Sequence, residues 1–187
     1  MTIQGLILNS ETKKAASLLA EKTFERYRNA PGHYRNTANS HLVGHLGEFA
    51  AFIWFRDNGF EPEASFSDPS KDRDCDIVTN IGRVEVKTWN EIYWENWGRA
   101  VTVSQYPSIK RKADFIFWCS VDDIQSETPK VSFRGFNEVG IFEEVSPMLT
   151  GNPGRMINNL QLELSQMRPL DEMGKLNATR GNITNGD

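Results

Sequence analysis

A strict alternation of apolar and charged residues near the middle of the chain places the strongest constraint on its fold. Val84 and Val86 alternate with Glu85 and Lys87, and successive side chains of a β-strand point to opposite faces of a sheet. In an extended strand the two valines therefore face a core, while the carboxylate and the ammonium project together from the other face. The segment predicts a strand on which Glu85 and Lys87 lie side by side.

A second strand-like run precedes this one and predicts a hairpin. Residues 75–78 read Cys-Asp-Ile-Val, and residues 79–82 supply the Asn and Gly that are typical of a tight connection. Pairing across this turn would bring Asp76 close to Glu85. Asp74 competes with Asp76 for this place, but Asp76 is preferred because two apolar residues follow it directly, whereas Asp74 ends a charged loop.

An amphipathic helix with an acidic residue is expected upstream of the hairpin. Its apolar stripe recurs at helical spacing and consists of Leu42, Leu46, Phe49, Ala50 and Ile53. Glu48 lies at the edge of that stripe and is the candidate for a third acid beside Asp76 and Glu85. Mg²⁺ prefers oxygen ligands in near-octahedral geometry and keeps some of its waters. Carboxylates that open to water on one side are therefore suited to this ion.

The order of these segments resembles the PD-(D/E)XK nuclease superfamily, whose core places an acidic helix before a hairpin that carries Asp and then Glu-X-Lys. Asp76, Glu85 and Lys87 match that pattern, with Glu48 as the helix acid. The resemblance covers roughly residues 41–121, and Cys75 stands where the family's proline would be. It implies a restriction-endonuclease-like α/β fold and a metal-dependent nuclease.

The resemblance also implies a role for each residue. Asp76, Glu85 and Glu48 would hold Mg²⁺, for which Mn²⁺ can substitute, and the ion would neutralise the phosphodiester and acidify a bound water. Lys87 would position that water and stabilise the charge that grows on the phosphorane. Gln105 follows a short β-prone run, in a region where superfamily members often carry a catalytic Gln.

The substrate expected from the resemblance is DNA. The Gln-X-X-X-Tyr motif of the exonuclease branch is absent, since Ile109 stands four residues after Gln105. We therefore expect an endonuclease that acts on duplex or branched DNA. Because cutting both strands symmetrically needs two active sites, a twofold homodimer is expected.

Basic and aromatic residues beside the motifs are candidate DNA contacts. The net charge of −4 does not indicate a generally basic surface, but a local basic rim can coexist with global acidity. Arg73 and Trp94 are candidates, the latter for stacking on bases, although core packing and a solvated surface are the alternatives. The expected phosphate-contacting cluster, which precedes a buried strand, is Lys110, Arg111 and Lys112.

Other interpretations of the same residues remain open. Glu85 and Lys87 would also suit an exposed charge pair of little energetic worth, and Glu48 a solvated helix face. His41 and His45 have the spacing of a zinc pair, but the chain lacks His-Glu-X-X-His and an evident third ligand. A non-catalytic nucleic-acid-binding or assembly module on the same fold is the alternative function.

The chain length of 187 residues and the hydrophobic content of 39% suit one α/β domain over residues 1–173, with an N-terminal helical segment and a disordered tail over 174–187. We expect a mixed central sheet of about five strands flanked by helices. Helices are expected from Asn9 or Ser10 to about residue 28, and from Asn39 or Ser40 to Asn58-Gly59. Strands are expected at residues 60–66, 113–121 and 130–136, whereas 139–145 and 156–167 are ambiguous.

Two cysteines are too few for a disulfide framework, and neither a secretory leader nor a membrane-length apolar run is evident. A cytoplasmic protein without a membrane partner is expected.

Overall fold

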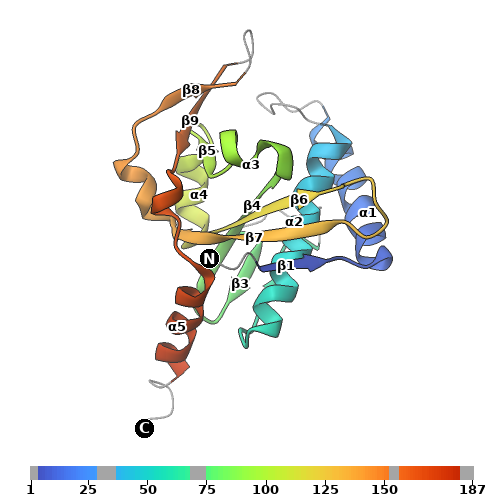
Figure 1. Ribbon diagram of the computed structural model, residues 1–187, viewed down its shortest axis with the longest axis horizontal. Helices are drawn as coiled ribbons and strands as arrows, with labels where there is room; N and C mark the ends of the chain where they lie inside the picture. Colours follow the sequence, from blue (N-terminus) through green and yellow to red (C-terminus); the bar gives the residue numbers. More distant parts are fainter. Residues whose placement is uncertain (1–3, 29–36, 68–74, 152–155, 182–187) are drawn as a thin grey trace.

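A six-stranded mixed sheet forms the centre of the computed structural model, which describes residues 4–28, 37–67, 75–151 and 156–181 (Figure 1). The strands lie in the order β1-β7-β6-β4-β3-β2. Strands β4 and β6 run parallel, and the other neighbouring pairs are antiparallel. The strand bounds are β1 (Gln4–Ile7), β2 (Glu63–Ala64), β3 (Ile77–Thr79), β4 (Gly82–Asn90), β6 (Phe115–Asp122) and β7 (Lys130–Glu138).

Two long helices, α1 (Ser10–Tyr27) and α2 (Ala38–Asp57), lie on one side of the sheet (Figure 1). Helix α1 begins after Asn9, as the sequence predicted, because the Asn9 side chain accepts a hydrogen bond from the Thr12 backbone N–H at 2.8 Å.

The start of α2 differs from the sequence prediction. Its cap is Thr37 rather than Asn39 or Ser40, because Thr37 and Ser40 satisfy each other's backbone N–H groups in a capping box. The helix ends as predicted at Asn58-Gly59, where Gly59 adopts a left-handed φ of 78°.

Shorter elements cover the opposite side of the sheet. They are α3 (Glu91–Trp97), α4 (Tyr106–Lys112), the 3₁₀ helix η1 (Val139–Glu144), and a small sheet with the order β5-β9-β8. The small sheet consists of β5 (Ala100–Thr102), β8 (Met148–Thr150) and β9 (Ile157–Gln161), and the 3₁₀ helix η2 (Leu164–Gln166) follows it.

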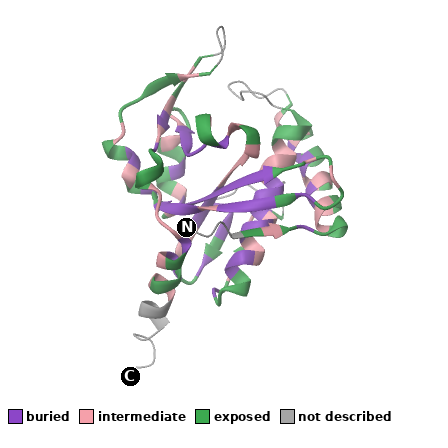
Figure 2. Ribbon diagram, viewed as in Figure 1, coloured by how far each residue is buried: buried purple, intermediate pink, exposed green. Residues whose placement is uncertain are grey.

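The central strands bury side chains on both faces, and Figure 2 shows them as the largest buried region. On one face Val84, Val86 and Phe117 pack with α2 in one hydrophobic cluster. On the other face Ile116 and Trp118 pack with α3 and α4 in a second cluster. Strand β6 therefore contributes to both cores, as expected of the apolar run at residues 113–121.

Several expectations about the elements need correction. The main sheet has six strands rather than about five, because Gln4–Ile7 pairs with β7 at an edge. The segment at residues 60–66 forms only the two-residue strand β2. A disordered tail was expected over residues 174–187, but residues 174–181 belong to α5 (Leu170–Gly181), and Asn177 of this helix donates to the Gly59 carbonyl at 3.0 Å. Residues 182–187 lie outside the described part.

Within the described residues, no helix is long and apolar enough to cross a membrane. Cys75 and Cys119 are both buried and free.

Candidate functional site

The β3–β4 hairpin brings Asp76 beside Glu85, as the sequence predicted. Ile77 pairs with Val84, and the Asp76 backbone N–H donates to the Val84 carbonyl at 3.1 Å. The Asp76 carboxyl group accepts a hydrogen bond from the Val86 backbone N–H at 2.8 Å. Asp76 and Glu85 are only 6% and 4% exposed. Two carboxyl groups are thus buried together at the start of the hairpin, whereas Asp74 lies outside the described residues.

Two lysines contact the two oxygens of Glu85. Lys87 Nζ lies 2.7 Å from Oε1, and Lys112 Nζ lies 2.8 Å from Oε2. Lys87 comes from the same strand face, while Lys112 comes from the last turn of α4. Both lysine side chains remain about one-quarter exposed. The site therefore has a buried acidic floor with two cations at its solvent side.

Glu48 on α2 completes the acidic side of the site. It is 8% exposed, and its Oε2 lies 2.7 Å from Nδ1 of His45. The charge of Glu48 acts on both Asp76 and Lys87. We refer to Asp76, Glu85, Lys87, Lys112 and Glu48 as the carboxylate cluster.

A glycine allows α2 to approach β4 closely next to Glu48. A Cβ atom on Gly47 would lie 1.7 Å from the Thr88 Oγ1 atom, a separation that no side chain tolerates. Gly47 therefore permits the close helix–strand packing that brings Glu48 over the hairpin. Thr88 follows Lys87 directly, so this contact fixes the helix at the level of the site.

Burial and charge set the protonation of the cluster. Burial raises the pKa of Asp76 to about 8, and the neighbouring charges of Glu85 and Glu48 act in the same direction. Burial also disfavours the charged form of Glu85, but Lys87 and Lys112 outweigh it and hold the pKa of Glu85 below its ordinary value. At neutral pH the cluster therefore contains an ionised Glu85 and a protonated Asp76.

The opposite shift keeps Lys87 charged. Burial disfavours its ammonium form, yet Glu85 and Asp76 outweigh burial and raise the pKa of Lys87 above its ordinary value. Lys87 is consequently a fixed cation, and it acts as a hydrogen-bond donor rather than as a base.

The donor chemistry of the cluster fits a hard divalent cation. Asp76 and Glu85 offer adjacent carboxyl oxygens, and Glu48 lies near enough for its charge to act on Asp76. In the described part of the chain, no three His, Cys, Asp or Glu side chains already converge as a complete metal site. Asp76 and Glu85 are therefore the residues that would hold the ion, with Glu48 as the outer acid.

Other predicted site residues lie in different places. Gln105 is exposed and precedes α4, at the end of this helix opposite to Lys112. In the ranges that the structure describes, no hydrogen bond or ion pair joins its side chain to the cluster. Lys110 pairs with Glu143 on the surface at 2.9 Å, and Arg111 is exposed. Arg73 falls outside the described residues.

Trp94 is a core residue, and the sequence prediction that it stacks on bases is wrong for this reason. It is 2% exposed and packs in the cluster between α3 and β6. The Arg99 and Arg134 guanidinium groups lie 5.6 Å and 5.3 Å from its ring centroid. Arg134 also pairs with Glu91, the first residue of α3. These contacts hold α3 against the sheet.

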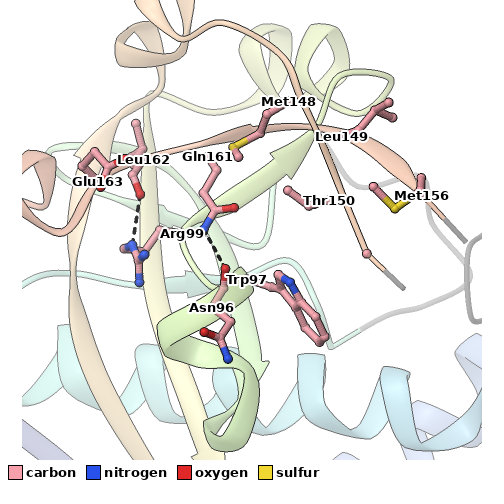
Figure 3. A pocket seen from close by; sticks show the side chains of 11 residues that line it. Asn96, Trp97, Arg99, Met148, Leu149, Thr150, Met156, Gln161, Leu162 and Glu163 are labelled. Atoms are coloured by element: carbon pink, nitrogen blue, oxygen red, sulfur yellow. Dashed lines mark hydrogen bonds between the residues drawn. The ribbon is translucent and has the colours of Figure 1, made fainter. Parts of the chain in front are cut away.

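A separate groove of about 370 Å³ lies between α3 and the β8–β9 hairpin (Figure 3). Trp97, Met148 and Met156 give it an apolar side. Gln161 Nε2 donates to the Asn96 carbonyl at 3.0 Å across its base. No residue of the carboxylate cluster lines this groove.

Two members of the site were placed only by the structure. The spacing of three residues between His45 and Glu48 on one helix already indicated that they are neighbours, but not that His45 is buried against the acid. The Lys112 side chain was expected at a phosphate, whereas it contacts Glu85 because α4 ends beside β4. Nothing in the local sequence indicates that α4 ends beside β4.

Comparisons of the chain with protein-family models, with curated proteins and with solved structures found no match.

Proposed function

We propose that the protein is a Mg²⁺-dependent DNA endonuclease of the PD-(D/E)XK type, with Mn²⁺ able to replace Mg²⁺. The observation that carries this proposal is the convergence of Asp76, Glu85 and Lys87 on one hairpin, with both acids buried. Charge pairs on a protein surface are solvated and contribute little to stability. Burying two carboxyl groups beside a lysine costs free energy, and buried titratable groups of this kind cluster at functional sites such as metal centres.

The proposed fold assignment is finer than the observed α/β architecture. We include in the proposal that α2, β3, β4 and β6 form a restriction-endonuclease-like core. The acid of α2 and the acids of the hairpin meet at one place in this arrangement, and β6 lies parallel to β4. The small sheet and α5 are additions to that core.

The residues of the cluster would divide the work of hydrolysis. Asp76 and Glu85 would hold Mg²⁺, and the bound ion supplies charge neutralisation at the phosphodiester. Lys87 Nζ lies 2.7 Å from Glu85 Oε1, and this lysine would donate hydrogen bonds to the attacking water and to the phosphorane oxygens. Lys112 would contact a non-bridging phosphate oxygen.

The same geometry explains how a protein with a net charge of −4 could attract a phosphate to this site. Two lysines stand at the solvent side of the acidic floor, so a phosphate that approaches the site first meets cations. We propose duplex or branched DNA as the substrate and a twofold homodimer as the form that cuts both strands. Light scattering in solution, with and without DNA, tests the dimer.

A labelled panel of supercoiled plasmid, linear duplex, single strand and four-way junction tests the activity and identifies the preferred substrate. Wild type should cleave at least one of these with Mg²⁺, and Glu85→Ala should cleave none of them. Asp171→Asn on the exposed surface of α5 is the matched acidic control and should behave as wild type. Thermal unfolding of each variant verifies that it is folded.

One observation favours a second function, a non-catalytic nucleic-acid-binding or assembly module. Lysines already contact both oxygens of Glu85, so the cluster is partly self-neutralised and would suit a purely structural ion pair. This function predicts no cleavage of any substrate and no binding of Mn²⁺ or Ca²⁺ by the wild-type protein. Calorimetric titration with either ion separates the two functions.

A further inference from the structure

A buried chain of hydrogen bonds connects α1 to the carboxylate cluster. Thr23 Oγ1 on α1 lies 2.9 Å from Nε2 of His45, and Nδ1 of the same ring lies 2.7 Å from Glu48 Oε2. Thr23 and His45 are 6% and 3% exposed. The imidazole is therefore held at both nitrogens and separated from solvent.

The geometry places each ring nitrogen against a different partner. Nδ1 of His45 faces Glu48 Oε2, and a carboxylate oxygen is an acceptor for a ring N–H. Nε2 faces the Thr23 hydroxyl, which can either donate or accept a hydrogen bond. Thr23 and Glu48 thus hold the imidazole between α1 and the acid.

We propose that His45 is a positioning residue that orients Glu48 toward the metal held by Asp76 and Glu85, with Thr23 fixing the ring. This inference rests on the proposed nuclease function. The charge of Glu48 already acts on Asp76 and Lys87, so its carboxyl group is close enough for its orientation to matter at the metal. Partners that orient a metal ligand commonly change metal affinity or activity about 10–100-fold when they are removed.

The geometry distinguishes two amide replacements. The Asn Nδ2 atom lies near the position of histidine Nδ1, so His45→Asn keeps a donor for Glu48. The Gln Nε2 atom lies nearer the position of histidine Nε2, so His45→Gln keeps a group that faces Thr23 and loses the donor to the acid. A role in volume filling would favour Gln, which is closer to His in size, whereas a positioning role favours Asn.

The test measures Mn²⁺ affinity by calorimetry and DNA cleavage in the presence of Mg²⁺, on the full chain. We expect His45→Ala and His45→Gln to weaken Mn²⁺ binding and slow cleavage by roughly 10-fold or more, and His45→Asn to retain most of both. Thr23→Val, which keeps the shape and removes the hydroxyl, should give a smaller loss in the same direction. It also carries the test if His45→Ala does not fold.

His41→Asn is the matched control, because His41 lies one turn earlier on the same helix and its ring contacts Phe24. It should leave both measurements unchanged. Equal losses in His45→Asn and His45→Ala, or no loss in His45→Ala, would overturn the positioning role while wild-type cleavage still supports the nuclease. A wild-type protein that neither binds Mn²⁺ nor cleaves DNA would refute the proposed function itself.

Discussion

Metal binding at the Asp76–Glu85 pair should release a proton, because Asp76 must ionise to serve as a ligand. Burial, with help from Glu85 and Glu48, raises the pKa of Asp76 to about 8. Below that pH each bound ion displaces one proton, so the apparent affinity should rise about tenfold, or about 1.4 kcal/mol, per pH unit. Between pH 6 and pH 8 the expected gain is roughly 100-fold. Above pH 8 Asp76 is already ionised, and the gain should end.

Calorimetric titration with Mn²⁺ or Ca²⁺ measures both quantities in this prediction. Titrations at pH 6, 7 and 8 give the affinity, and buffers of different ionisation enthalpy give the number of protons released, expected to approach one at pH 6. Glu85 should contribute little to this number, because Lys87 and Lys112 hold its pKa below the ordinary value. An affinity that is independent of pH between 6 and 8 would refute the reasoning, since Asp76 would then be ionised throughout.

Three further predictions concern residues around the pair. Replacing Lys112 with Met removes a cation that competes with a metal for the Glu85 carboxylate. Mn²⁺ should therefore bind more tightly in calorimetric titration, while plasmid nicking should slow. Weaker Mn²⁺ binding would contradict this prediction. Gly47→Ala should lower the free energy of unfolding, measured in urea, by about 1–3 kcal/mol, because the new Cβ would lie 1.7 Å from Thr88 Oγ1. Gly44→Ala is the control, since a Cβ there meets no atom within 4 Å and should not destabilise the fold. Equal stabilities of the two variants would show that α2 does not pack this closely. Asp76 keeps its proton in the folded state up to about pH 8 but loses it in the unfolded chain near pH 4, so wild-type stability should fall as pH rises through this window. Asp76→Asn cannot ionise, so its thermal stability should rise relative to that of wild type from pH 5 to pH 8. A difference in melting temperature that stays constant over this range would contradict the raised pKa of Asp76.

The hairpin and its acids were predictable because the information is local. Val84 and Val86 face a core, Glu85 and Lys87 share the other face, and the turn between the strands fixes Asp76 opposite Glu85. A period of two and a short turn require no knowledge of distant contacts.

The surroundings of the hairpin depend on tertiary packing and were only partly predictable. Lys112 reaches Glu85 because α4 ends beside β4, and this crossing has no local signal. The polar sequence neighbours of Trp94 suggested that its side chain is exposed; they are Glu91, Glu95 and Asn96. The short helix α3 nevertheless directs the Trp94 ring into the hydrophobic cluster. A strand of four residues such as β1 has too few positions for its period to be recognised.

Plasmid nicking with Mg²⁺ by wild type, Lys87→Ala and Lys175→Ala is the most direct test of the proposed catalytic role of Lys87. Lys175 is an exposed lysine of α5 whose Nζ lies 3.7 Å from Asp171 Oδ2, so it controls for the loss of one positive charge. We expect nicking by wild type and Lys175→Ala and none by a folded Lys87→Ala. Nicking by Lys87→Ala at the wild-type rate would contradict the assignment of the site.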